Sequence, residues 1–127
     1  MNLNQDFQEG VTTLLKSVSP FAANTVFYVQ GEESTQYPYV VFDMTKTNDR
    51  SFQTDYDDTT LVLNIYSNHS NTNQINDITE SVLTVFDRKK VTLSSHWMSP
   101  MIRTVSTITK NGLGNWQSII TYETTIN

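Results

Sequence analysis

The hydrophobic pattern is clearest in two segments near the middle of the chain, residues 39–45 and 59–66. In the second segment Leu61, Leu63 and Ile65 occupy alternate positions, and the side chains between them belong to the other face. A period of two in β-branched and aromatic residues is typical of strands. The pattern predicts a hairpin whose polar loop, residues 46–58, is far longer than the two to five residues that most hairpins need.

A period of three to four residues predicts two amphipathic helices, at residues 3–18 and 72–88. Their apolar stripes are Leu3, Phe7, Val11, Leu14, Leu15 and Val18 in the first, and Ile75, Ile78, Val82, Leu83 and Phe86 in the second. Ser19-Pro20 ends the first helix, because the residue before a proline avoids helical angles. The basic cluster at residues 88–90 falls at the end of the second, where cations complement the negative pole.

Four further strands are expected, at residues 25–30, 91–93, 101–109 and 116–126, with a turn at residues 111–115 before the last one. Short connections between neighbouring strands favour antiparallel pairing, and two amphipathic helices need an apolar sheet face to cover. The predicted fold class is α+β: a mostly antiparallel sheet with both helices packed on it and a long hairpin loop.

Composition and charge exclude several classes of protein and of binding site. A chain of 127 residues is expected to form one domain, residues 1–127. It has no cysteine, so disulfide frameworks and thiolate metal sites are excluded. We expect neither a secretory signal nor a membrane span. The net charge of −5 with few cations argues against nucleic-acid binding, which requires a positive patch.

The sequence contains few of the residue patterns that are typical of catalytic or metal sites. His69 and His96 have no second histidine or cysteine at metal-ligand spacing. No nucleophile elbow or phosphate-cradling glycine loop is present, so we expect no enzyme activity and no cofactor. A small metal-dependent hydrolase using Asp55, Asp57 and Asp58 with His69 is an open alternative, because three carboxylates can hold a divalent cation.

The long loop is the candidate functional segment. It embeds aromatic side chains among charges, and a large side chain with polar neighbours is a common interface anchor. The candidate interface residues are Arg50, Phe52, Asp55, Tyr56, Asp57 and Asp58. The alternative is a solvated, self-repelling loop with no partner.

The order of elements resembles a known family. An amphipathic helix is followed by Val-Phe-Tyr, the strand Tyr-Pro-Tyr-Val-Val-Phe at residues 37–42, a long loop, Leu-Val-Leu-Asn-Ile-Tyr-Ser at residues 61–67, a helix and a closing hairpin. This order is similar to that of the tail terminator proteins of tailed bacteriophages, also called tail completion or tail-to-head joining proteins. The resemblance covers nearly the whole chain, from Leu3 to Ile126.

The resemblance implies a structural protein of the virion, assembled in the bacterial cytoplasm. Its expected partners are copies of itself in a ring, commonly a hexamer, the tail tube protein, and the head-completion or neck protein. The ring would cap the tube, end its polymerisation and offer the docking surface for the head. The acidic balance suits a lumen through which DNA slides without specific binding. A neck connector ring on the same axis is the closest alternative.

Overall fold

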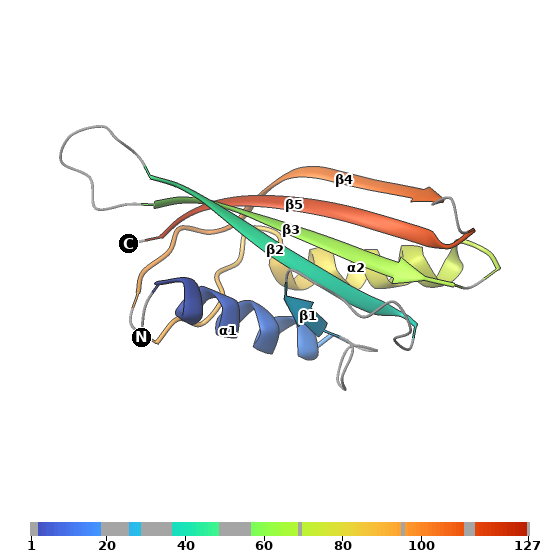
Figure 1. Ribbon diagram of the computed structural model, residues 1–127, viewed down its shortest axis with the longest axis horizontal. Helices are drawn as coiled ribbons and strands as arrows, with labels where there is room; N and C mark the ends of the chain where they lie inside the picture. Colours follow the sequence, from blue (N-terminus) through green and yellow to red (C-terminus); the bar gives the residue numbers. More distant parts are fainter. Residues whose placement is uncertain are drawn as a thin grey trace.

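The computed structural model describes residues 3–18, 26–28, 37–48, 57–68, 70–94, 96–110 and 114–126. Two helices and five strands occur in the order α1 (Leu3–Lys16), β1 (Val26–Tyr28), β2 (Tyr39–Asn48), β3 (Asp57–Ser67), α2 (Asn73–Phe86), β4 (Ile102–Lys110) and β5 (Trp116–Ile126). The strands form one sheet in the order β1-β2-β3-β5-β4 (Figure 1). The predicted α+β class is therefore confirmed.

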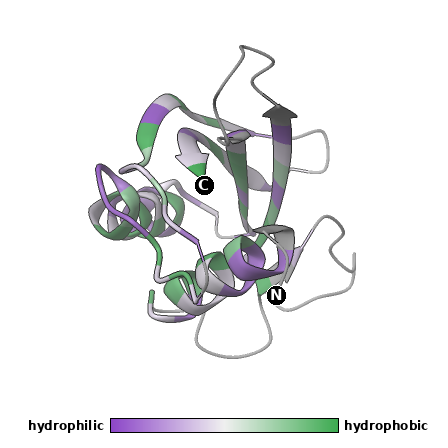
Figure 2. Ribbon diagram, turned by 90° about the vertical axis from the view of Figure 1, so that its left-hand side faces the viewer, coloured by the Kyte–Doolittle hydropathy of each residue, from purple (hydrophilic) through white to green (hydrophobic). Residues whose placement is uncertain are grey.

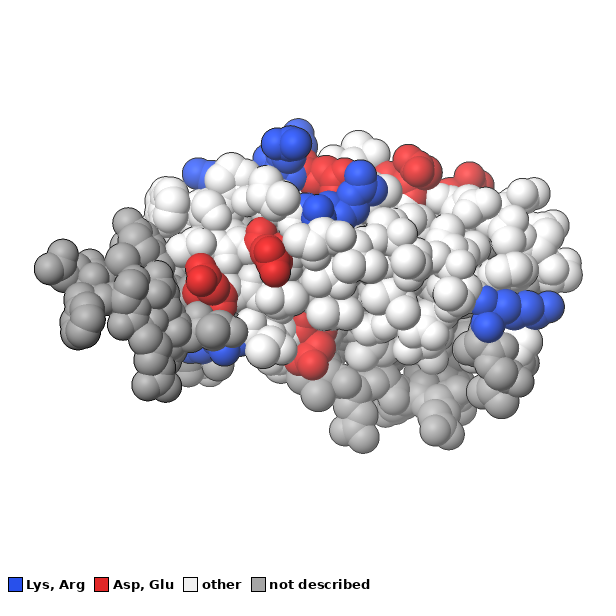
Figure 3. Space-filling model, turned by 90° about the horizontal axis from the view of Figure 1, so that it is seen from above, with Lys and Arg blue, Asp and Glu red and all other residues white. Residues whose placement is uncertain are grey.

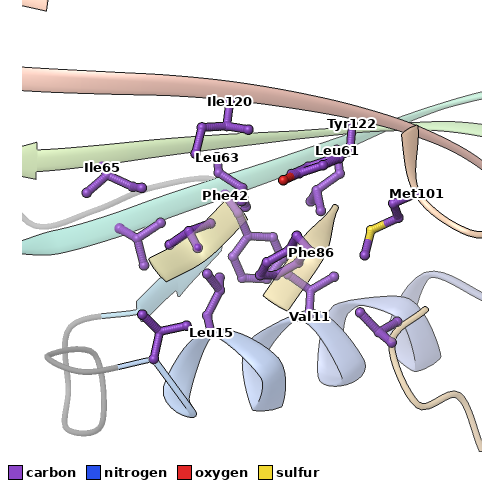
Figure 4. Packing of buried hydrophobic residues seen from close by; sticks show 14 of the residues in the cluster. Val11, Leu15, Phe42, Leu61, Leu63, Ile65, Phe86, Met101, Ile120 and Tyr122 are labelled. Carbon is purple, nitrogen blue, oxygen red and sulfur yellow. The ribbon is translucent and has the colours of Figure 1, made fainter. Parts of the chain in front are cut away.

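Both helices pack on the same side of this sheet (Figures 1 and 2). Their apolar stripes meet the inward-facing positions of the strands, where Phe42, Leu61, Leu63 and Ile120 are fully buried (Figure 4). Period-two alternation puts every second strand residue on this side, and the helices supply the matching apolar layer. The result is a two-layer domain, with its core between helices and sheet.

Hydrogen bonds of buried hydroxyl groups connect the helix layer to the sheet. They give these buried polar groups the partners that apolar packing could not supply. Thr79 of α2 donates to the carbonyl of Ile75 at 2.7 Å, and its hydroxyl lies 2.8 Å from that of Ser118 in β5. Tyr122 of β5 donates to Asp87 just after α2 at 2.6 Å. Burial, followed by this hydrogen bond to a carboxylate, raises the pKa of Tyr122 far above its ordinary value.

The hairpin loop is shorter than predicted. β2 extends to Asn48 and β3 begins at Asp57, so the connection comprises residues 49–56 rather than 46–58. The register pairs Thr47 with Asp58 and Asn48 with Asp57. On its other side, β3 pairs with β5 along its full length, down to Asp57 opposite Ile126. Ladder hydrogen bonds on both sides hold these polar residues in a strand, although their side chains carry no strand signal.

The predicted strand at residues 91–93 is wrong. Val91 is buried, but this segment belongs to an irregular stretch that crosses α1. A Cβ built on Gly10 would lie 2.9 Å from the carbonyl oxygen of Thr92 and 3.0 Å from a methyl group of Val91. Val91 therefore packs onto a helix instead of pairing in the sheet, and Gly10 permits the close approach.

The expectation of antiparallel neighbours fails at β1, which pairs in parallel with β2, Val26 opposite Val40 and Tyr28 opposite Phe42. The other three pairings are antiparallel, as expected. α2 ends at Phe86, two residues earlier than predicted. The basic cluster thus lies beyond the last helical turn, where Arg88 adopts a left-handed backbone angle (φ 57°) and donates its N–H to Met101. None of the described helices is long and apolar enough to cross a membrane.

Candidate assembly surface

The sheet side opposite the helices carries no described helix, and we call it the open face. It is made of the strand positions that alternate with the core positions, as fixed by the registers. Its side chains are Tyr39, Val41, Asp43 and Thr45 of β2; Asp58, Thr60, Val62, Asn64 and Tyr66 of β3; Gln117, Ile119, Thr121, Glu123 and Thr125 of β5; and Ile102, Val105, Thr107 and Thr109 of β4.

The charges of the open face have one sign. Its charged residues are Asp43, Asp58 and Glu123, and none of the side chains that the register places there is a Lys or Arg. Figure 3 views the molecule from this side and shows isolated red patches on a mostly uncharged surface, with red and blue patches together along the upper border and a further blue patch at the right-hand end. A broad polar surface with fixed carboxylates repels phosphate groups.

One end of the open face is stiffened by aromatic rings. The ring of Tyr39 stacks on that of Tyr66, with centroids 4.9 Å apart, and lies 5.2 Å from the ring of Tyr37. The hydroxyl of Tyr37 accepts a hydrogen bond from Asn115 at 3.0 Å. Burial, and then the neighbouring Tyr37, raises the pKa of Tyr66. Cross-strand aromatic pairs of this kind stabilise a sheet without help from a second layer.

The other end of the open face, at the start of β3, is hollowed into a groove of about 580 Å³. Its walls come from β3, β5 and the residues leading into β4: Asp58, Thr59, Thr60, Ser99, Pro100, Ile102, Glu123, Thr124 and Thr125. The hydroxyl of Thr125 donates to Asp58 at 3.2 Å, and its backbone N–H donates to the hydroxyl of Ser99 at 3.0 Å. Its lining thus combines hydroxyls and two carboxylates with the apolar side chains of Pro100 and Ile102.

The candidate interface residues from the sequence divide into two groups. Asp57 and Asp58 were placed in the loop, which is wrong, because both lie in β3. Asp58 is exposed and lines the groove, so the structure gives it a place on the open face. The remaining four, Arg50, Phe52, Asp55 and Tyr56, lie outside the described residues, as does His69.

Possible metal ligands do not converge in the described part of the chain, where no group of three or more His, Asp or Glu side chains could hold an ion. Asp57 is described only by its backbone pairing, and Asp55 and His69 lie outside that part. The metal-dependent alternative therefore remains a hypothesis about those residues.

A hydrogen-bonded contact that the sequence did not predict joins α1 to the irregular stretch between α2 and β4. Asp6 of α1 is only 2% exposed and accepts hydrogen bonds from the backbone N–H of Ser94, at 2.7 Å, and from Nδ1 of His96, at 2.8 Å. His96 lies in the irregular stretch between α2 and β4. The pair fastens this stretch across α1, which is a structural role.

Exposed apolar side chains accompany this stretch and the strand that follows it. Trp97 is 52% exposed and lies under the ammonium of Lys90, which is 5.4 Å from the ring centroid. Ile102 is 47% and Val105 43% exposed, both on β4. An apolar residue in a strand is ordinarily read as core, so no pattern in the sequence marks Ile102 and Val105 as exposed.

The fold is shared with solved structures, although no match was found from the sequence. No protein-family profile matches the sequence, and no curated protein matches it. Among solved structures, one chain from the virion of a native gene transfer agent (GTA) particle aligns with a TM-score of 0.70 at 8% identity, over 98% of this chain and 93% of that chain. A second solved chain aligns with a TM-score of 0.65 at 10% identity over the same shares. At these identities the likeness establishes a shared fold over nearly the full length of all three chains.

Proposed function

We propose that this chain is a structural protein of a phage-like virion and that it forms the ring that terminates the tail tube. The observation that carries the proposal is the alignment with a chain of the gene transfer agent virion over nearly all of both chains. The order of elements that resembles tail terminators, from the first helix to the closing hairpin, supports the finer assignment.

The proposed activity is geometric and breaks no bond. Copies of the chain close into a ring, commonly of six, on the last layer of tube protein, and the exposed rim receives the head-completion or neck protein. A closed cyclic ring needs one surface of each copy to meet a different surface of the next. The hairpin connection, with Arg50, Phe52, Asp55 and Tyr56, is proposed to contact the tube or a neighbouring copy.

The open face is proposed to line the DNA channel. Its charged side chains, Asp43, Asp58 and Glu123, are all carboxylates, and uncharged Thr, Asn and Gln side chains lie among them. DNA passing such a wall meets repulsion and no cation to hold a phosphate. The helices then lie on the outside of the ring.

Removal of the gene from the phage genome tests the assignment. Loss of a terminator is expected to give tubes of uncontrolled length and free, filled heads, scored by electron microscopy. Tubes of normal length that fail to join heads would instead assign the chain to the neck ring. Particles whose images contain no cyclic collar of this chain would refute both assignments.

The loop contact has its own test. Replacing Phe52 and Tyr56 by alanine is expected to leave the circular dichroism spectrum unchanged, because both lie outside the β2–β3 ladder, and to reduce tail capping in a complementation assay. Normal capping and normal tail lengths in the double variant would exclude these two residues from the interface.

The channel assignment is tested by charge reversal. The triple variant Asp43→Lys, Asp58→Lys, Glu123→Lys is expected to assemble but to slow DNA ejection, because lysines at the wall bind phosphates. The matched control reverses three exposed carboxylates of the helices, Glu9, Asp77 and Glu80, and gives the same net charge. Equal ejection rates in the two triple variants would refute the assignment of the open face to the channel.

A further inference from the structure

Strand β4 lies at one edge of the sheet (Figure 1), and both of its faces are exposed. Among the described strands it pairs with β5 alone. Its helix-side positions, opposite the inward-facing residues of β5, are Arg103, Ser106, Ile108 and Lys110. Of these only Ile108 is half-buried, so the helix layer leaves this strand largely uncovered. Residues 104–109 contain neither a charge nor a proline, the devices that usually block an edge strand.

The direction of the backbone groups along β4 follows from its ladder with β5. The N–H of Ser99 donates to the carbonyl of Thr125 at 2.9 Å, so Thr125 directs its backbone groups toward this edge. In an antiparallel ladder the direction alternates from residue to residue. Every second residue of β5, counted from Thr125, therefore bonds to its paired residue in β4. Apart from the bulge at Thr104, the β4 residues that direct their N–H and C=O groups outward are Arg103, Ser106, Ile108 and Lys110.

The outer edge of β4 begins where a shorter pairing ends. The N–H of Arg88 donates to the carbonyl of Met101, and the N–H of Met101 donates to the carbonyl of Lys89, both at 2.9 Å. Residues 88–89 thus lie beside Met101 in the position of a sixth strand. No described strand continues this pairing along β4. A strand added to β4 would therefore extend a pairing that the chain itself begins.

The two charged side chains of β4 are both cations, and both lie on its helix side. Their partners on β5, Tyr122 for Arg103 and Trp116 for Lys110, are six residues apart. A regular strand on the outer edge therefore meets the two cations at positions six apart, on one face. A carboxylate at each position would form an opposite-charge pair across the strands, which stabilises a sheet. Asp87 lies 3.7 Å from Arg103, but both side chains are more than a third exposed, so water screens this pair.

A second copy of β4 is a poor partner for this edge. When two β4 strands overlap fully in antiparallel orientation, Arg103 of each copy lies opposite Lys110 of the other. Like charges directly opposite each other destabilise a sheet. The side chains on the open face also point to a different strand, because Ile102 and Val105 are 47% and 43% exposed there. Apolar side chains on the partner strand would remove this area from water.

We propose that β4 accepts an extended segment of another protein as the sixth strand of the sheet. The segment has apolar side chains on the face that continues the open face, beside Ile102 and Val105. On its opposite face it carries two carboxylates six positions apart, one opposite Arg103 and the other opposite Lys110. Main-chain hydrogen bonds to the outward N–H and C=O groups supply the affinity, and the two charge pairs set the register. This docking is a property of the single chain and does not depend on the proposed ring.

The probe for this site is the end-blocked peptide Glu-Val-Thr-Val-Thr-Val-Glu, which has the required alternation and spacing. Its affinity for the full-length protein is measured by fluorescence anisotropy, and amide hydrogen exchange is followed by NMR. The expected result is slower exchange of the outward amides of Ser106 and Ile108. The matched control peptide, Lys-Val-Thr-Val-Thr-Val-Lys, is expected to bind at least about tenfold more weakly, because both charge pairs become repulsive.

Two variants separate the edge of β4 from the rest of the surface. Ser106→Pro removes an outward N–H but no hydrogen bond to β5, and proline is tolerated in a strand at such a position. This variant is expected to keep its circular dichroism spectrum and to bind the acidic peptide at least about tenfold more weakly, whereas Ser106→Ala keeps the affinity. The double variant Arg103→Gln, Lys110→Gln is expected to bind the two peptides equally. Its matched control, Lys16→Gln with Lys90→Gln at exposed positions, keeps the preference for the acidic peptide.

The alternatives have distinct signatures. Equal affinity of the wild-type protein for the two peptides, or an unchanged preference in the Arg103→Gln, Lys110→Gln variant, would overturn the inference. Unchanged affinity in a folded Ser106→Pro variant also overturns it, and if that variant does not fold, the double variant decides alone. A wild-type dimer whose protected amides lie in β4 would make a second copy the occupant and likewise overturn it. None of these outcomes bears on the ring, which removal of the gene tests separately.

Discussion

The contact between Gly10 and the stretch that crosses α1 gives a test in which two physical effects have opposite signs. Considered as a helix residue alone, Gly10 costs about 1 kcal/mol relative to alanine, so Gly10→Ala should stabilise the protein. The structure predicts the reverse. The new Cβ would lie 2.9 Å from the carbonyl oxygen of Thr92, and 3.0 and 3.2 Å from two carbons of Val91.

The magnitude follows from how little the obstacle can move. A backbone carbonyl cannot rotate away like the end of a flexible side chain, and the stretch is fastened two residues later by the hydrogen bond from Ser94 to Asp6. Overpacking of a tight contact costs about 1–3 kcal/mol. After subtraction of the helix-propensity gain of about 1 kcal/mol, the expected net loss of unfolding free energy is about 1 kcal/mol.

Urea unfolding followed by far-UV circular dichroism measures this difference. The matched control is Thr13→Ala, an exposed position of α1, where alanine is expected to add about 0.5 kcal/mol because no neighbour is crowded. The two variants should shift the midpoint in opposite directions with unchanged slopes. A Gly10→Ala variant that is stabilised as much as or more than the control would refute the close approach between α1 and the stretch.

Two further predictions concern buried hydroxyls. Tyr122→Phe removes the donor to Asp87 and should cost about 1 kcal/mol near pH 8. Because the pKa of Tyr122 is raised in the folded state, its stabilising effect is complete below the unfolded value near 10 and is lost as the pH rises above it. Urea titrations should therefore show the difference from wild type shrinking above pH 10, and a constant difference would contradict the assigned cause. Thr79→Val should cost about 1–2 kcal/mol because it leaves the buried Ser118 hydroxyl without this partner, whereas adding Ser118→Ala should cost little more, and strictly additive losses would contradict the coupling.

Local periodicity was enough to predict most elements. The last strand has the predicted bounds, residues 116–126, and α1 differs from its prediction only at the last turn. These elements bury one face each, so the sequence records the face directly as a repeat of two or of three to four residues. The fold class followed from the same repeats, because apolar helix stripes need an apolar sheet face.

Features that depend on distant partners were missed or misplaced. Asp57 and Asp58 are in a strand because β5 pairs with them, and their side chains carry no record of that ladder. Asp6 and His96 are separated by 90 positions, so no spacing rule could bring them together. The wrong strand at residues 91–93 has the same origin, since a short apolar run is equally consistent with packing on a helix.

The amino-acid sequence by itself determined which residues form helices and strands, the α+β class and the acidic balance of the chain, because each of these is a property of neighbouring residues or of their sum. Only the tertiary structure decided the strand order and the parallel pairing of β1. Among the described residues, it also placed Asp43, Asp58 and Glu123, with no Lys or Arg, on the open face, and it left β4 at one edge of the sheet. The physical reason is that a surface is assembled from strands that are remote in the chain, and pairing between remote strands is set by the packing of the whole domain.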